Sequence, residues 1–110
     1  MSDIAKKFEQ GVLALHRQPQ SRPVMDKFRQ LHDAALADGA LDRATKELLA
    51  LAISIATHCE GCIAWHVQAA TQAGATPNQV AEAIGVAVLM GGGPATYYGS
   101  MALTELHDTQ

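Results

Sequence analysis

Two cysteines and a histidine stand close together in the segment 59–66, and their side chains are those that thiol chemistry requires. Cys59 and Cys62 are separated by two residues, and His66 follows Cys62 by four. On a helix, residues four apart lie one turn apart on the same face, so the imidazole of His66 can serve the thiol of Cys62. Two thiols at this spacing can close a disulfide, and a thiolate is the nucleophile of disulfide exchange. The pattern therefore predicts a thiol-disulfide redox centre.

Cys59 stands at or just before the predicted start of a helix that reaches Ala73 and is closed by Gly74. The partial positive charge of a helix N-terminus favours the thiolate form of a cysteine placed there. The chain has two cysteines, both in this pair. In a reducing compartment such a pair is more typical of catalysis or metal binding than of a structural disulfide. We therefore expect both thiols to be reactive.

Glu47 is the carboxylate that can complete this centre. It lies near the start of an otherwise apolar helix, predicted over residues 43–56 with Asp42 as its N-cap. A carboxyl group in apolar surroundings is costly unless it is hydrogen-bonded or used. If this helix and the next pack as an antiparallel hairpin, Glu47 faces His66 directly or through a water and orients it as a base. The alternative is a solvated first-turn acid that favours the helix dipole.

Other interpretations of the cysteine pair remain open. The two side chains can be inert, buried small hydrophobes. His58, Cys59, Cys62 and His66 also have the side-chain types of four zinc ligands, although ligands crowded at one helix start differ from the usual zinc arrangement. His58 can otherwise cap a helix, face water or take a catalytic role. Haem attachment does not fit, because no histidine directly follows Cys62.

The fold predicted around these residues is an all-α bundle of about six helices. Alanine is the commonest residue, aromatic residues make up 5%, and apolar positions recur with the helical period and almost never alternate. A length of 110 residues indicates a single domain, residues 1–110. The expected helices cover about residues 4–15, 23–38, 43–56, 60–73, 77–90 and 95–106, with a break at Gly91 to Pro94.

Two of these helices have distinct apolar patterns. The second is expected to place Val24, Phe28, Leu31 and Ala35 on one face. The third has leucines and isoleucines in nearly every direction and should be buried on most sides, which five short helices can hardly achieve alone. A small domain also hides only about 60 to 70 % of its unfolded surface. We therefore expect a homo-oligomer.

Composition narrows the choice of partners and compartment. The net charge is −3, and lysines and arginines are scattered without a basic stripe, so nucleic acid is not an expected partner. No apolar run reaches the length of a membrane-spanning helix, and the first residues carry charges where a secretory signal has an apolar stretch. These features predict a cytoplasmic protein that does not bind a membrane. No pattern predicts a cofactor or a metal.

The spacing Glu47-x11-Cys59-x2-Cys62-x3-His66 resembles the alkyl hydroperoxidase D (AhpD)-like branch of the carboxymuconolactone decarboxylase family. The text KELLALAISIATHCEGCIAWHVQAATQAGATPNQVAEAI is similar to the core helical unit of that family, and the resemblance covers about residues 23 to 106. It implies an AhpD-like all-helical oligomer, often a trimer or hexamer, with thiol-dependent peroxidase or disulfide reductase activity in antioxidant defence. Lactone decarboxylation is the other chemistry of the family, in members that typically lack this cysteine pair.

The resemblance also implies a role for each residue. Cys62 is the thiol oxidised by peroxide, Cys59 is the more exposed partner that resolves it as a disulfide and meets the reductant, and His66 and Glu47 move the proton. The implied partners are a lipoylated protein or another dithiol reductant and a peroxiredoxin. Peroxidase members can carry a histidine immediately before the second cysteine, whereas this chain has Gly61 there and His58 before the first cysteine.

Overall fold

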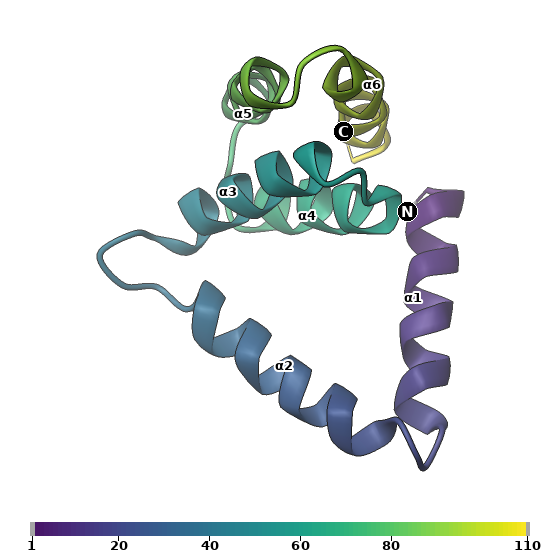
Figure 1. The fold of residues 1–110 in the computed structure, drawn as a ribbon. Helices are drawn as coiled ribbons and strands as arrows, with labels where there is room; N and C mark the ends of the chain where they lie inside the picture. The colour runs from purple at the N-terminus through teal and green to yellow at the C-terminus, as the bar shows by residue number, and fades with distance from the viewer. Residues whose placement is uncertain (1, 110) are drawn as a thin grey trace.

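The computed structural model describes residues 2–109, and within that range every regular element is a helix (Figure 1). The all-α prediction is therefore confirmed. The six helices are α1 (Asp3–Arg17), α2 (Arg22–Leu36), α3 (Arg43–Ala56), α4 (Glu60–Gln72), α5 (Pro77–Gly91) and α6 (Gly93–Asp108).

Side-chain caps explain where several helices begin. The Asp42 carboxylate accepts a hydrogen bond from the backbone N–H of Thr45, and so fixes the start of α3. At α5, the Thr76 hydroxyl accepts from the N–H of Gln79, while the Gln79 side chain accepts from the N–H of Thr76. Because these caps are local, the starts of both helices lie where the sequence predicts them. The break before α6 is shorter than predicted, since only Gly92, at φ 72°, separates α5 from α6.

Helices α3 to α6 hold the core. Leu51, Ile55, Ile63, Val67 and Val80 are fully buried in it. In Figure 1, α3 and α4 run side by side in opposite directions, and α5 and α6 lie together across them. At Gly99 of α6 an added Cβ would stand 2.9 Å from a methyl group of Ile84, so the missing side chain lets α5 and α6 approach closely.

Helices α1 and α2, here called the arm, project from this core (Figure 1). The buried residues of the two helices are Ala5 and Leu36, near the ends where the arm joins the rest of the chain. The predicted apolar face of α2 is not covered: Val24, Phe28 and Leu31 are 67%, 59% and 63% exposed. Within residues 2–109, this face is therefore left largely open to solvent.

The prediction that α3 is buried on most sides also holds only in part. Leu51 and Ile55 are inaccessible to solvent, whereas Leu49 is 50% and Ile53 is 63% exposed. The exposed pair lies on the side that α4 and α5 leave open. None of the helices within residues 2–109 is long and apolar enough to cross a membrane.

Candidate active site

The four predicted site residues lie on the hairpin of α3 and α4. Residues 57–59 connect the two helices, so the start of α4 lies beside the end of α3. Cys59 is the N-cap of α4, and Cys62 lies in its first turn. A disulfide joins their sulfur atoms, and the two Cα atoms are 5.2 Å apart. The prediction that these cysteines can pair is therefore confirmed.

The backbone at the start of α4 points a donor at the sulfur of Cys59. The N–H of Cys62 donates a hydrogen bond to Cys59 Sγ at 3.2 Å. Once the disulfide is reduced, the same N–H and the positive end of the α4 dipole favour a thiolate at this position. The helix start thus offers a stabilised leaving group for disulfide exchange.

Glu47 and His66 meet across the hairpin, one from each helix. His66 Nδ1 lies 3.0 Å from Glu47 Oε2, within hydrogen-bond distance. The Glu47 side chain is fully buried, whereas that of His66 is 16% exposed. A solvated first-turn acid is therefore ruled out for Glu47. One turn of α4 separates His66 from Cys62. The carboxylate therefore contacts an imidazole on the helix face that carries Cys62.

Arg43, which the sequence reasoning did not single out, is a second partner of Glu47. Its Nε lies 3.3 Å from Glu47 Oε1. Burial alone would raise the pKa of Glu47, but the hydrogen bond and charge of His66 and the Arg43 guanidinium outweigh it and lower that pKa below its usual value. The carboxylate is therefore ionised at neutral pH. The spacing of four residues between Arg43 and Glu47 on one helix could have indicated this ion pair from the sequence.

Phe8 of α1 explains why position 61 is a glycine. A Cβ added at Gly61 would stand 2.5 Å from Phe8 Cδ2 and 2.7 Å from Cγ. The phenyl ring therefore occupies the space that a side chain at 61 requires. The Phe8 ring also meets the edge of Trp65 at a centroid distance of 6.2 Å. The histidine that some AhpD-like peroxidases carry before the second cysteine would not fit here while α1 packs on α4.

The alternative zinc arrangement finds no support in the geometry. Among residues 2–109, no group of three or more histidine, cysteine, aspartate or glutamate side chains is placed to hold a metal ion. His66 is engaged by Glu47, and His58 stacks on Tyr98 of α6, with ring centroids 4.4 Å apart and planes 4° apart. The four side chains considered as ligands therefore point to different partners.

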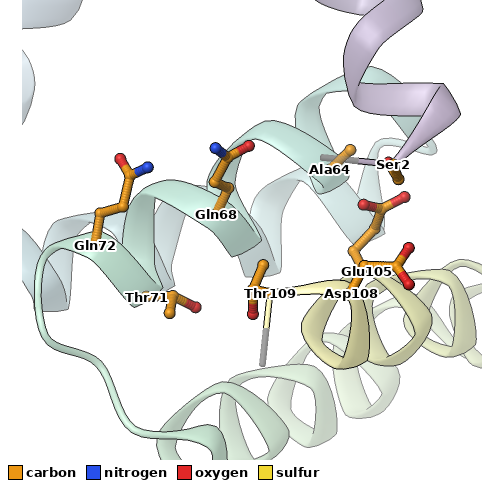
Figure 2. A pocket seen from close by; sticks show the side chains of 8 residues that line it. All are labelled: Ser2, Ala64, Gln68, Thr71, Gln72, Glu105, Asp108 and Thr109. Atoms are coloured by element: carbon orange, nitrogen blue, oxygen red, sulfur yellow. The ribbon is translucent and has the colours of Figure 1, made fainter.

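Two hollows lie near this hairpin. One, of about 260 Å³, is lined by residues of α4, α6 and the start of α1, and includes Gln68, Glu105 and Asp108 (Figure 2). None of the four predicted site residues lines it. The other is an open groove of about 580 Å³ along α1 that reaches Glu60 and Gly61, the two residues between the cysteines. Neither cysteine lines this groove, which reaches only the two residues between them.

Comparison with known families now places the chain. Residues 22–105 match the model of the carboxymuconolactone decarboxylase family. The chain belongs to this family. The matched range begins with α2 and leaves out α1, the helix whose Phe8 covers Gly61.

Relatives of known sequence and structure agree with this assignment. "Uncharacterized protein 4 in cox locus" of Paracoccus denitrificans is 43% identical over 83 residues, which are 76% of this chain and 75% of that protein. The crystal structure of an apo carboxymuconolactone decarboxylase family protein from Legionella pneumophila superposes with a TM-score of 0.89 at 37% identity, over 96% of this chain and 93% of that one.

A third relative comes from Thermotoga maritima. Its crystal structure superposes with a TM-score of 0.81 at 25% identity, over 97% of this chain and 89% of that one. That protein is a carboxymuconolactone decarboxylase family member suggested to be involved in an antioxidative response. The all-helical arrangement is thus shared within the family.

Proposed function

We propose that this chain is an AhpD-like thiol-dependent peroxidase or disulfide reductase that works through Cys59, Cys62, His66 and Glu47. One observation carries the proposal. A fully buried carboxylate, Glu47, is hydrogen-bonded to an imidazole that lies one helical turn from a cysteine in a disulfide. A buried carboxylate and imidazole beside a thiol form the base arrangement that activates sulfur nucleophiles. An inert cysteine pair would not require it.

In the oxidative half-reaction, Cys62 is the thiol that reacts with peroxide. His66 takes the proton of the Cys62 thiol, and the thiolate attacks one oxygen of the peroxide. The O–O bond breaks, the sulfur becomes a sulfenic acid, and the leaving alkoxide receives the proton from His66. The Cys59 thiol then attacks the sulfenic sulfur and closes the disulfide, and the sulfenic oxygen leaves as water with the proton that Cys59 gives up. Glu47 stabilises the imidazolium that forms between these steps.

In the reductive half-reaction, an external dithiol restores both thiols. Cys59, at the N-terminus of α4, receives the attack of the reductant, and Cys62 leaves as a thiolate. A lipoylated protein or another dithiol fits this step, and a peroxiredoxin fits as a further electron acceptor. These partners come from the resemblance to AhpD-like proteins. A cytoplasmic location agrees with the need for a dithiol supply.

We further propose that the chain works as a homo-oligomer, a trimer or a hexamer. The exposed apolar side chains support this, because α2 shows Phe28 and Leu31 to solvent and α5 shows Leu89 and Met90, which are 80% and 78% exposed. Exposed apolar surface of this kind on consecutive helical turns is typical of an interaction face. The four proposed redox residues all come from the α3–α4 hairpin of one chain. A second subunit is therefore not needed to supply any of them.

The proposed function is tested by peroxide turnover in the presence of a dithiol. The native chain should consume hydrogen peroxide or an alkyl hydroperoxide when dithiothreitol or dihydrolipoamide is present. Cys59→Ser and Cys62→Ser should each reduce that turnover to the uncatalysed rate, because no disulfide can form. Unchanged turnover in both variants would rule the mechanism out.

Three further measurements distinguish the other interpretations. One tightly held zinc per chain after purification would indicate a structural metal site, because bound zinc blocks both thiols. Native thiols without any peroxide or disulfide reactivity would indicate a partner-binding module. The lactone substrate of the decarboxylases, offered directly, tests the remaining activity of the family.

A further inference from the structure

Two helix ends, those of α3 and α4, share one backbone hydrogen-bonding motif but carry different residue types at its left-handed position. At the end of α3, the N–H of His58 bonds to the carbonyl of Ile55, and the N–H of Cys59 bonds to the carbonyl of Ser54. At the end of α4, Gly74 bonds to Thr71, and Ala75 bonds to Ala70, in the same order. Both are Schellman motifs, whose penultimate residue takes a left-handed conformation.

Glycine occupies this left-handed position at one end and histidine at the other. Gly74 has φ 100°, and His58 has φ 60°. His58 is the one residue other than glycine with a positive φ among those the structure describes. Glycine adopts this conformation without steric cost, whereas a side chain there is strained. Strained residues that persist in a fold are concentrated at functional sites. The imidazole at position 58 therefore needs an explanation other than the turn itself.

The imidazole of His58 is held in place by Tyr98. The two rings are nearly parallel, with planes 4° apart and centroids 4.4 Å apart. Tyr98 is itself partly buried against the core, and the edge of Tyr97 supports it at a centroid distance of 5.2 Å. His58 remains exposed to solvent and directly precedes Cys59, the N-cap of α4. The stacked, exposed imidazole thus belongs to the residue that adjoins Cys59 in the chain.

The two histidines next to the cysteine pair flank it on opposite sides in the sequence. His66 follows Cys62 by one turn and is held by the buried Glu47. His58 adjoins Cys59 and is held by an aromatic ring from α6. We propose that His58 is the proton-transfer residue of Cys59 in the reductive half-reaction. This inference rests on the proposed thiol-disulfide function and adds a residue that acts on the reductant side alone.

Reduction of the disulfide takes two thiol-disulfide exchange steps. A thiolate of the dithiol reductant attacks Cys59 Sγ, the disulfide bond breaks, and Cys62 leaves as a thiolate that is protonated through His66. The second thiol of the reductant loses its proton to solvent. The resulting thiolate attacks the other sulfur of the reductant, which is bonded to Cys59 in the mixed disulfide. The bond to Cys59 then breaks, and His58 gives its proton to the departing Cys59 thiolate. The reductant becomes a disulfide, the chain gains two electrons and two protons, and His58 regains its proton from solvent.

His58→Gly is the informative variant, because glycine suits the backbone of this position. We expect its melting temperature to equal or exceed that of the native chain. Reduction of its disulfide by dithiothreitol, followed by stopped flow, should be about tenfold slower, because the proton donor is lost. Oxidation of the pre-reduced variant by hydrogen peroxide should stay within about twofold of native, because His66 serves that step. Free imidazole in the buffer should restore the rate of reduction.

Matched variants separate proton transfer from structural support. Tyr98→Phe keeps the stacked ring, so its disulfide should be reduced at the native rate. The disulfide of Tyr98→Leu should be reduced as slowly as that of His58→Gly. His107→Gln removes an exposed imidazole elsewhere on α6 and is the control. A rate of disulfide reduction in His58→Gly within about twofold of native would overturn the proposal. Equal slowing of both half-reactions, without rescue by imidazole, would overturn it too.

The design also keeps this proposal distinct from the proposed function. Reduction by dithiothreitol is measured without peroxide. Suppose that the native chain does not react with peroxide, but that the disulfide of His58→Gly is reduced tenfold more slowly than the native disulfide. The peroxidase activity is then wrong, and the role of His58 stands. If peroxide oxidises both chains alike and both are reduced at the same rate, the role of His58 is wrong and the peroxidase activity stands.

Discussion

The hairpin of α3 and α4 and the arm of α1 and α2 are both pairs of consecutive helices with apolar faces, but only the hairpin places a fully buried apolar face in the core. Leu51 and Ile63 of the hairpin are inaccessible, whereas Phe28 and Leu31 of the arm are more than half exposed. The same contrast applies to their carboxylate and histidine pairs. Glu47 meets His66 in the interior, while Asp33 meets His32 at 3.3 Å with a carboxylate side chain that is 67% exposed.

This contrast separates pairs that can do chemistry from pairs that merely lie close together. An exposed carboxylate and histidine interact through water and salt, which weaken the attraction, and such pairs contribute little. A buried pair keeps its orientation and its charge in a medium of lower dielectric constant. The packing of α3 and α4 therefore gives Glu47 and His66 their proposed role, since the residue types alone occur in the arm as well.

The largest expected difference between the two pairs is in activity. Glu47→Gln should lower peroxide turnover about 100-fold, because His66 loses the carboxylate that orients it and stabilises its protonated form. Asp33→Asn makes the same chemical change in the arm and should leave turnover within about twofold of native. Steady-state rates with circular dichroism as a check on folding measure both. Similar rates for the two variants would remove the distinction between the pairs.

The second difference is in stability. Ile55→Ala leaves a cavity in the core and should lower the free energy of unfolding by about 2 to 5 kcal/mol. Phe28→Ala removes an exposed ring of the arm and should change it by about 0.5 kcal/mol or less in the dissociated chain. Denaturant titration at one low chain concentration makes the comparison, and sedimentation reports whether Phe28→Ala weakens self-association. An arm variant as damaging as the core variant would show that α2 is packed in the single chain.

The place where arm and hairpin meet is Gly61, and it gives a smaller effect. Gly61→Ala introduces a Cβ into the Phe8 ring and should destabilise the chain by about 1 to 3 kcal/mol. Combining it with Phe8→Ala should recover most of that loss, because the space is then free. The double-mutant cycle measures the coupling. Independent effects of the two substitutions would mean that α1 does not rest on the start of α4.

The smallest effect is expected in acid. The pKa of Glu47 is lowered in the folded chain, so its interactions with His66 and Arg43 add stability above the unfolded value of about 4.3. This contribution is lost as the pH falls through the lowered folded value. Unfolding measured between about pH 6 and pH 3 should show a steeper loss in the native chain than in Glu47→Gln. Parallel curves would contradict the ion pair.

Much of the fold followed from local signals in the sequence. Asp42 and Thr76 marked the starts of α3 and α5, and Gly74 marked the end of α4, because caps act within a few residues. The apolar face of α2 was also predicted from its sequence. The surface that packs against that face was not, since periodicity identifies an apolar side of a helix but not its partner.

The site was predicted to a similar depth. The spacing of the cysteines and His66 indicated a disulfide and a shared helical face. The apolar surroundings of Glu47 indicated a carboxylate with a hydrogen-bond partner or a chemical role. The contact between Phe8 and Gly61 and the stack of His58 on Tyr98 join residues from separate helices. Such contacts depend on how α1 and α6 pack, which no local pattern specifies.

Cys59 and Cys62 are proposed to cycle between two thiols and one disulfide. Counting free thiols in the reduced chain, before and after one equivalent of hydrogen peroxide, measures this cycle. Two thiols per chain should disappear together and return after treatment with a dithiol. Two thiols that persist after peroxide, in a folded chain free of metal, would contradict it.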